Sequence, residues 1–412
     1  MSQKLLDGVS TKDESDVRWL LDNDPAININ AVGGHHFCET ALGIAVWRGH
    51  EGIVALLLDR GADINIVGGT YGTALGVAAY CGNERFVNLL LDRGAHVNTM
   101  GGTFGTALGV ATYWEKERIM ALLLYRGAEV NIVGGTYGTA LGVAASMGKE
   151  GIVAFLLDRG ADINTVGGAL GTALGVAAYW EKEGVVAQLL DRGADVNTVG
   201  GTYGTALGVA AYRGNQDIVG LLLNQGADVS TVGGEYGTAL GMAAYAGQEE
   251  IVALLLDRGA DINTVGGAYE TALGVAAYRG KEGVVALLLD RGADVNTVGG
   301  KYGTALGVAV RNENGEILNL LLDRGADIST VAGRYGTALG LAVYNGNEKI
   351  LNLLLDRGAD VNTVGGTYGT ALGVATYAGY GWVVELLLDR GADINTVGGI
   401  FFFFVNHYSY LY

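Results

Sequence analysis

Residues 271–303 read TALGVAAYRGKEGVVALLLDRGADVNTVGGKYG, and this stretch recurs with small changes through most of the chain. The tripeptide Thr-Ala-Leu begins eleven times, and each start lies 33 residues after the previous one. The starts are Thr40, Thr73, Thr106, Thr139, Thr172, Thr205, Thr238, Thr271, Thr304, Thr337 and Thr370. Self-similarity at a fixed period of this length indicates a solenoid in which each unit stacks on its neighbours.

Each unit contains two short helices and a loop. The threonine before Ala-Leu is a favoured N-cap residue for the first helix. The second helix, exemplified by residues 282–291, carries a wide apolar stripe, and Arg291 and Gly292 are typical of its end. The paired glycines that follow predict an extended arm folded back by a turn. A parallel β-helix is disfavoured, because Leu-Leu-Leu-Asp-Arg-Gly has no period-two alternation.

The repeated unit resembles the ankyrin repeat. One unit matches the family's pattern in register at Thr238, Leu240, Ala243, Ala244, Gly247, Ile251, Val252, Leu254, Leu255, Leu256, Gly259, Ala260, Asp261 and Asn263. The resemblance implies an all-α ankyrin-repeat solenoid with a helix–turn–helix and a β-hairpin-like loop in each unit. In detail the units look like the ankyrin arrays of filamentous fungi, which are often fused to a NACHT-type nucleotide-binding domain.

Two positions depart from the ankyrin pattern. The proline after the capping threonine is alanine in all eleven units, and the histidine is glycine, as at Gly76, Gly109 and Gly142. Glycine inside a helix costs about 0.5–1 kcal/mol relative to alanine. Our hypothesis is that a loop tyrosine two residues before each cap packs over this glycine and fills the histidine's space. These tyrosines are Tyr71, Tyr137, Tyr203, Tyr236, Tyr269, Tyr302, Tyr335 and Tyr368.

The repeats predict a simple domain organisation. Residues 1–39 form a degenerate N-terminal partial repeat, residues 40–399 form eleven repeats, and residues 400–412 form an aromatic tail that breaks the register. We expect this tail either to cap the last unit or to mark a truncated product of a longer array, and we prefer truncation.

Differences between units identify candidate binding residues. The residue after the first helix and the loop residue three before each cap vary most, whereas the cap, the stripe and the turn glycines hardly change. A tyrosine closes the first helix in eight units, and tyrosine, tryptophan and arginine dominate binding hot spots. The candidates are Trp47, Arg48, Tyr80, Tyr113, Trp114, Tyr179, Trp180, Tyr212, Arg213, Tyr245, Tyr278, Arg279, Lys301, Arg311, Arg334, Tyr344 and Tyr377. The alternative is that the tyrosines pack against one another in a ladder and bind nothing.

Composition bears on the class of partner and on location. Lys+Arg 26 against Asp+Glu 43 leave a formal charge of −17, which repels phosphate backbones and anionic lipids. We therefore expect protein partners, and no nucleic acid or membrane partner. Cys38 and Cys81 are expected to be reduced thiols, and the first residues lack the apolar segment of a secretory signal. A cytoplasmic, intracellular location is predicted, with the nucleus left open, and a monomer, with association through the tail left open.

We find no pattern that predicts an enzyme, a cofactor or a metal site. The segment His35-His36-Phe37-Cys38 has no second cluster to complete the four ligands of structural zinc. The Gly-Gly-x-Tyr-Gly loops lack the Gly-Lys-Ser/Thr of a phosphate-binding loop, and the carboxylates recur evenly along a rim. The predicted function is non-catalytic protein recognition through the concave face. The alternatives are the sensor part of a larger NACHT-type signalling ATPase and a structural spacer.

Overall fold

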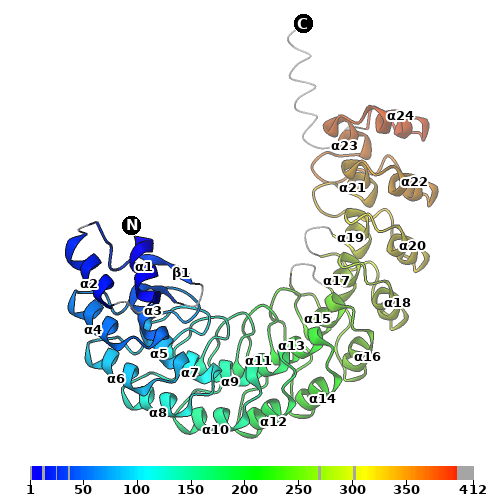
Figure 1. The fold of residues 1–412 in the computed structure, drawn as a ribbon. Helices are drawn as coiled ribbons and strands as arrows, with labels where there is room; N and C mark the ends of the chain where they lie inside the picture. The colour runs from blue at the N-terminus through cyan, green and yellow to red at the C-terminus, as the bar shows by residue number, and fades with distance from the viewer. Residues whose placement is uncertain are drawn as a thin grey trace. The chain divides into compact units, whose positions relative to one another are not determined.

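The computed structural model describes residues 2–11, 14–24, 26–35, 38–267, 271–299 and 303–396. It begins with a helix pair, α1 (Ser2–Thr11) and α2 (Glu14–Asn23), and a small antiparallel sheet, β1 (Val32–His35) and β2 (Cys38–Thr40). Helix pairs follow in every repeat (Figure 1). The predicted all-α fold of repeated helix pairs is confirmed. Lys301, Tyr269, Tyr302 and the tail 400–412 lie outside the described residues.

The first helices are seven or eight residues long and the second helices nine. The first helices are α3 (Ala41–Arg48), α5 (Ala74–Cys81), α7 (Ala107–Tyr113), α9 (Ala140–Met147), α11 (Ala173–Tyr179), α13 (Ala206–Arg213), α15 (Ala239–Ala246), α17 (Ala272–Tyr278), α19 (Ala305–Arg311), α21 (Ala338–Asn345) and α23 (Ala371–Ala378). The second helices are α4 (Glu51–Asp59), α6 (Glu84–Asp92), α8 (Glu117–Tyr125), α10 (Glu150–Asp158), α12 (Glu183–Asp191), α14 (Gln216–Asn224), α16 (Glu249–Asp257), α18 (Glu282–Asp290), α20 (Gly315–Asp323), α22 (Glu348–Asp356) and α24 (Gly381–Asp389).

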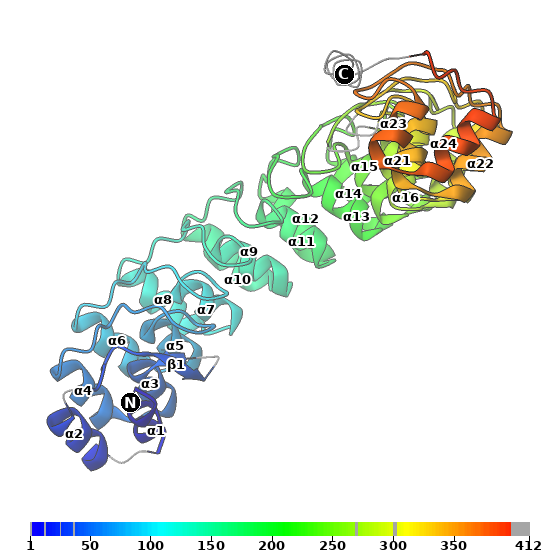
Figure 2. The ribbon, with the colours of Figure 1, turned by 90° about the horizontal axis from the view of Figure 1, so that it is seen from above.

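Contacts divide the chain into two compact units. Unit 1 contains Met1–Ala210 and Gly220–Ala227, and unit 2 contains Ala211–Val219 and Asp228–Tyr412. Within each unit the first helices stack side by side in one layer and the second helices in another, as the two views show (Figures 1 and 2). The arms between helix pairs leave the layers together, so equivalent residues of successive repeats form rows.

The start and end of the helices follow the predicted capping. In every repeat the threonine hydroxyl accepts a hydrogen bond from the amide of the glycine three residues later, as Thr139 does from Gly142 at 3.1 Å. After the second helix a glycine takes the left-handed conformation, with φ +88° at Gly292. These caps satisfy backbone groups that short helices would otherwise leave without partners.

The core lies between neighbouring repeats. Val176 and Ala177 of α11 and Val186 and Leu189 of α12 are almost completely buried. Helix α11 contacts both α9 of the preceding repeat and α12 of its own. Since helices of fewer than about ten residues are marginal alone in water, this burial between copies holds them in place.

The glycine of the first helix is explained by backbone, which corrects our hypothesis about the loop tyrosine. At Gly142 an added Cβ would overlap the carbonyl oxygen of Tyr137, and the same holds at Gly76, Gly241 and Gly373 for their loop residues. The tyrosine ring does not fill this space. Glycine is needed here because a loop carbonyl lies directly against its Cα.

The arms also depend on glycine. The amide of Gly101 donates to the carbonyl of Gly105 at 2.6 Å, which closes the arm, and the amide of Thr103 donates to the carbonyl of Thr70 in the preceding arm at 2.9 Å. A Cβ at Gly101 would overlap a methyl group of Val67 in the preceding arm. The paired glycines therefore let successive arms approach closely.

Two polar rows join the repeats on the side of the second helices. Arginines pair with the aspartate of the preceding repeat, as Arg192 does with Asp158 at 3.1 Å. Such exposed pairs stabilise by at most about 1 kcal/mol each. Asparagine side chains accept from the next repeat's backbone, as Asn164 does from the amide of Asp195 at 2.8 Å. Ser329 stands at this asparagine position, and its hydroxyl donates to Asp327 of its own repeat at 2.5 Å.

Replacing the first-helix glycine with alanine is expected to destabilise the protein. Gly142→Ala should cost about 1–3 kcal/mol, because the carbonyl of Tyr137 must move to make room. The control is Gly220→Ala in the middle of α14, where an added Cβ meets nothing within 4 Å and should stabilise by about 0.5–1 kcal/mol. Urea denaturation measures both, and a gain in stability for Gly142→Ala would contradict the backbone explanation.

Restoring the asparagine row should stabilise unit 2. Ser329→Asn is expected to add about 0.5–1.5 kcal/mol, because its side chain gains the amide of the next repeat as a donor. The matched reverse change, Asn263→Ser, removes a 2.9 Å bond from the amide of Asp294 and should cost a similar amount. Urea denaturation of both variants tests this, and equal midpoints for the two would show that the row contributes nothing.

Candidate functional site

Aromatic rings connect several arms to the end of the first helix of the same repeat. In five repeats the loop ring lies against the ring that closes the first helix nine residues later, stacked in four of them and tilted by 36° for Phe104–Tyr113. The centroid distances are 4.3 Å for Tyr71–Tyr80, 4.4 Å for Phe104–Tyr113, 3.9 Å for Tyr236–Tyr245, 4.1 Å for Tyr335–Tyr344 and 4.3 Å for Tyr368–Tyr377. We call these loop and helix-end rings the aromatic ladder. These pairs join two different positions of one repeat, whereas the alternative left open by the sequence was a ladder of identical residues from successive repeats.

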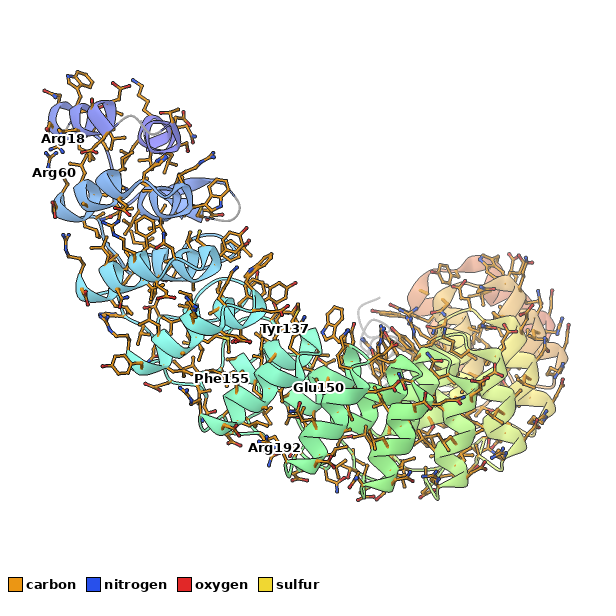
Figure 3. The ribbon with its side chains drawn as sticks, turned by 60° about the horizontal axis from the view of Figure 1, so that its bottom comes forward. Arg18, Arg60, Tyr137, Glu150, Phe155 and Arg192 are labelled. Atoms are coloured by element: carbon orange, nitrogen blue, oxygen red, sulfur yellow. The ribbon has the colours of Figure 1, made fainter. Side chains whose placement is uncertain are left out.

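The ladder also runs from one repeat to the next. Tyr71 lies 6.3 Å from Phe104, Phe104 lies 6.3 Å from Tyr137, and Tyr335 lies 6.0 Å from Tyr368, all with nearly parallel planes. Figure 3 shows Tyr137 on the side of the arms and first helices, and Arg192 on the opposite side. The loop rings are therefore packing residues, whereas the helix-end rings form the outer edge of the ladder.

Packing changes the acid–base behaviour of the ladder. Burial, then a hydrogen bond to Tyr344, raises the pKa of Tyr335 to about 12. Burial also raises the pKa of Tyr71 and of Tyr236 above the ordinary tyrosine range. The folded ladder therefore favours the uncharged form of these tyrosines.

The helix-end candidates keep part of their surface in solvent. Those that are half-buried are Trp47, Tyr80, Tyr113, Tyr179, Tyr212, Tyr245 and Tyr278. Those that are exposed are Arg48, Trp114, Trp180, Arg213, Arg279, Arg311, Arg334, Tyr344 and Tyr377. The first-helix ends thus present most of the predicted residues on one side of each unit.

The residue after each helix-end position forms a second row, which we call the variable row. It contains Arg48, Cys81, Trp114, Met147, Trp180, Arg213, Ala246, Arg279, Asn312, Asn345 and Ala378. Two members are tied down: Asn312 donates to the carbonyl of Tyr278 at 2.5 Å, and Asn345 donates to the carbonyl of Val310 at 3.2 Å. Asn312 and Asn345 therefore have a structural role in joining repeats.

Other members of the variable row are held by aromatic contacts and remain exposed. Trp114 lies edge-on to Tyr80 of the preceding repeat at 5.0 Å and to Tyr113 at 5.4 Å. The Arg279 guanidinium lies 4.4 Å from the ring centre of Tyr245. A large side chain that is already held in place loses little freedom when it binds, which suits it to recognition.

The two units differ in the chemistry of this surface. In unit 1 the exposed residues of the row include Trp114 and Trp180, and in unit 2 they include Arg213 and Arg279. Arg334, at an arm tip of unit 2, adds a guanidinium 5.5 Å from the ring of Tyr368, and it donates to the Tyr368 hydroxyl at 2.8 Å. Arg48 of unit 1 is exposed as well, so both units present arginines and unit 1 adds the exposed tryptophans, although the whole chain is acidic.

The sequence analysis did not identify two features of the side formed by the first-helix ends and the arms. An aliphatic residue six positions before each described cap from Val67 to Val364 is exposed, and Val298 is 56% exposed. This residue recurs directly before the paired glycines, and that recurrence could have revealed the exposed row from the sequence. Glu115, Glu181 and Glu313 have φ between 55° and 57° at a position where other repeats have glycine. A non-glycine residue in this region is strained, and the missing glycine was the signal.

The structure was also searched for metal sites and membrane helices. Within the described ranges no three His, Cys, Asp or Glu side chains gather in a way that could hold a metal ion. His36 and Phe37 of the histidine-rich segment lie outside those ranges, and burial raises the pKa of Cys38 to about 11. None of the helices described is both long and apolar enough to cross a bilayer.

Comparisons with known proteins agree with the repeat pattern. The family model "Ankyrin repeats (3 copies)" matches residues 8–101, 108–200, 174–266, 264–332 and 331–397. Among solved structures, the human ASB11 ankyrin repeat domain is 28% identical and aligns over 53% of this chain and 98% of its own, with a TM-score of 0.46. Comparison with curated proteins found no match.

The ladder predicts a loss of stability at alkaline pH. A folded-state pKa above the unfolded value of about 10 means that this stability is present below about pH 10 and is lost as the pH rises. We expect the urea midpoint to fall between about pH 10 and pH 12, and to fall less in Tyr335→Phe, which keeps the ring and loses the titrating group. An identical fall in the variant would exclude Tyr335 as a contributor.

Proposed function

The chain belongs to the ankyrin-repeat family, and from this premise we propose that it is a non-catalytic scaffold for protein–protein interaction. The proposed binding surface is the side of each unit formed by the first-helix ends and the arm tips, the concave side in the solenoid predicted from the sequence. Exposed Trp114, Trp180 and Arg279 carry the proposal, because their neighbours hold them in place while the scaffold does not dictate their identity. The partner is a folded protein or a peptide segment.

Charge supports the choice of this side. The repeated Asp-Arg pairs occupy the second-helix ends, where much of the negative charge is already paired with arginine of the next repeat, as in Arg357–Asp323 at 2.8 Å. The helix-end side carries aromatic rings and arginines. Interface cores are enriched in aromatic residues and arginine, which the helix-end side supplies, while Glu115, Glu181 and Glu313 follow the variable row there.

The alternatives give different expectations. If the chain is a structural spacer, removing the exposed side chains leaves every interaction intact. If it is the sensor part of a NACHT-type signalling ATPase, the genomic sequence beside the reading frame encodes a nucleotide-binding motif, and the surface proposed here is the sensing surface.

Paired substitutions test the scaffold and separate the two units. Trp114→Ala with Trp180→Ala removes the aromatic anchors of unit 1, and Arg213→Ala with Arg279→Ala removes the cations of unit 2. We expect at least one pair to reduce partner recovery in affinity-capture mass spectrometry from the native host by tenfold or more, since truncating a hot spot costs about 2 kcal/mol or more.

The control for this experiment is Tyr125→Ala. Tyr125 ends a second helix and is 86% exposed, so the variant removes an aromatic side chain from the opposite layer. It should leave capture unchanged. Circular dichroism confirms that all variants fold, and unchanged recovery with both pairs would favour the spacer.

A further inference from the structure

The aromatic ladder has an interruption in unit 1. In the repeat that begins at Thr139, the loop ring is Tyr137, and the helix-end position nine residues later is Ser146. In the two preceding repeats this position holds Tyr80 and Tyr113, each within 4.4 Å of its loop ring. The helix-end residue of this repeat therefore provides no ring that could stack on the loop ring.

The Ser146 side chain is held by its own helix. Its hydroxyl donates to the carbonyl of Val143 in its own helix at 2.7 Å. The ring contacts of Tyr137 within the described chain are with Phe104 at 6.3 Å and Tyr113 at 6.4 Å, both from the preceding repeat. Tyr137 is half-buried, as are Tyr236 and Tyr335, which do have helix-end partners at 3.9 and 4.1 Å.

A second ring lacks the same partner. Trp114 lies edge-on at 5.0 Å to Tyr80, the helix-end ring of the preceding repeat. The equivalent neighbour of Trp180 is Ser146, and among described rings Trp180 contacts Tyr179 alone, at 5.5 Å. Trp180 is 44% exposed, against 39% for Trp114. By equivalence with Tyr71 and Trp114 of the earlier repeats, Tyr137 and Trp180 lie next to the same ladder position, where Ser146 stands in place of a ring and is itself 7% exposed.

The remaining border is also apolar. Met147 follows Ser146 and is half-buried, and Leu170 replaces the loop ring of the next repeat. Methionine adapts its shape to a neighbour and makes favourable contacts with aromatic rings. The border therefore offers stacking and edge contacts, and its chemistry matches an uncharged aromatic ring.

We propose that an aromatic side chain of the protein partner occupies this ladder position, stacked on Tyr137 and edge-on to Trp180. This inference rests on the proposed function and names the partner's anchor. The occupant is a phenylalanine, tyrosine or tryptophan, since the same position in the sibling repeats holds a phenol at a centroid distance of 3.9–4.4 Å. Offset-stacked and edge-to-face pairs are the arrangements that aromatic rings prefer.

The most informative variant places an aromatic ring of the protein itself at this ladder position. Ser146→Tyr supplies the missing ring and should raise the melting temperature by roughly 2 °C, as an added aromatic pair does in a unit of this size. The same variant should abolish binding of the partner's ring. Ser146→Ala is the matched control, because it removes the hydroxyl and adds no ring.

A small probe measures the site without knowledge of the partner. p-Cresol has the side chain of tyrosine, and its affinity is expected to be about millimolar. In spectra of protein labelled at the methionine methyl groups, p-cresol should shift Met147 and leave buried Met242 unchanged. The Met147 shift should persist in Ser146→Ala, disappear in Ser146→Tyr, and weaken at least threefold in Trp180→Ala. If Ser146→Tyr fails to fold, the titration of p-cresol into Trp180→Ala tests the proposal in its place.

Selection of displayed random peptides extends the test to protein ligands. Peptides selected on the wild-type chain should contain an aromatic residue, should bind Ser146→Ala equally, and should lose at least tenfold affinity for Ser146→Tyr. Peptides that bind Ser146→Tyr as well as the wild type would overturn this inference and leave the scaffold function standing. A Met147 signal unmoved by p-cresol would overturn it as well.

Discussion

Burial between neighbouring copies is the constraint on which the rest of this structure depends. Each repeat contains one helix of seven or eight residues and one of nine, which are too short to persist alone in water. Val186 and Leu189 are buried in α12, which packs against α11 of its own repeat and α10 of the preceding one. Each capping threonine and glycine adds a small stabilising free energy, and this contribution recurs in every repeat.

Close backbone approach follows from that stacking and explains the high glycine content. The first-helix glycine, as at Gly142, lies against a loop carbonyl, and the arm glycine, as at Gly101, lies against an aliphatic side chain of the preceding arm. Because the carbonyl fills the space beside the glycine, the loop ring extends to the helix end and builds the aromatic ladder. The family's histidine is thus replaced by a different connection between loop and helix, made of backbone contact and stacked rings.

Residues of the aromatic ladder pack the repeats together and, in the proposed function, also contact the partner. The inner rings stabilise the arms, and the outer rings and the variable row face solvent with little freedom left to lose. Where the ladder is regular, its rings satisfy one another. Where the repeat departs from regularity, at Ser146 and at the exposed tryptophans and arginines, the surface acquires features that differ between repeats and can distinguish one partner from another.

The sequence by itself determined the repeat length, the helix pairs, the capping threonines and the rows of variable residues, because these depend on local propensity and on a period repeated eleven times. It left open whether identical tyrosines of successive units pack against one another in a ladder. Only the tertiary structure decided that a carbonyl rather than a ring faces Gly142, that Asn312 and Asn345 are tied to the preceding helix, and that the Ser146 hydroxyl bonds to its own helix. The contacts of Gly142, Asn312 and Asn345 join residues of different repeats or different elements, and their geometry is set by how the copies stack, which no single 33-residue unit contains.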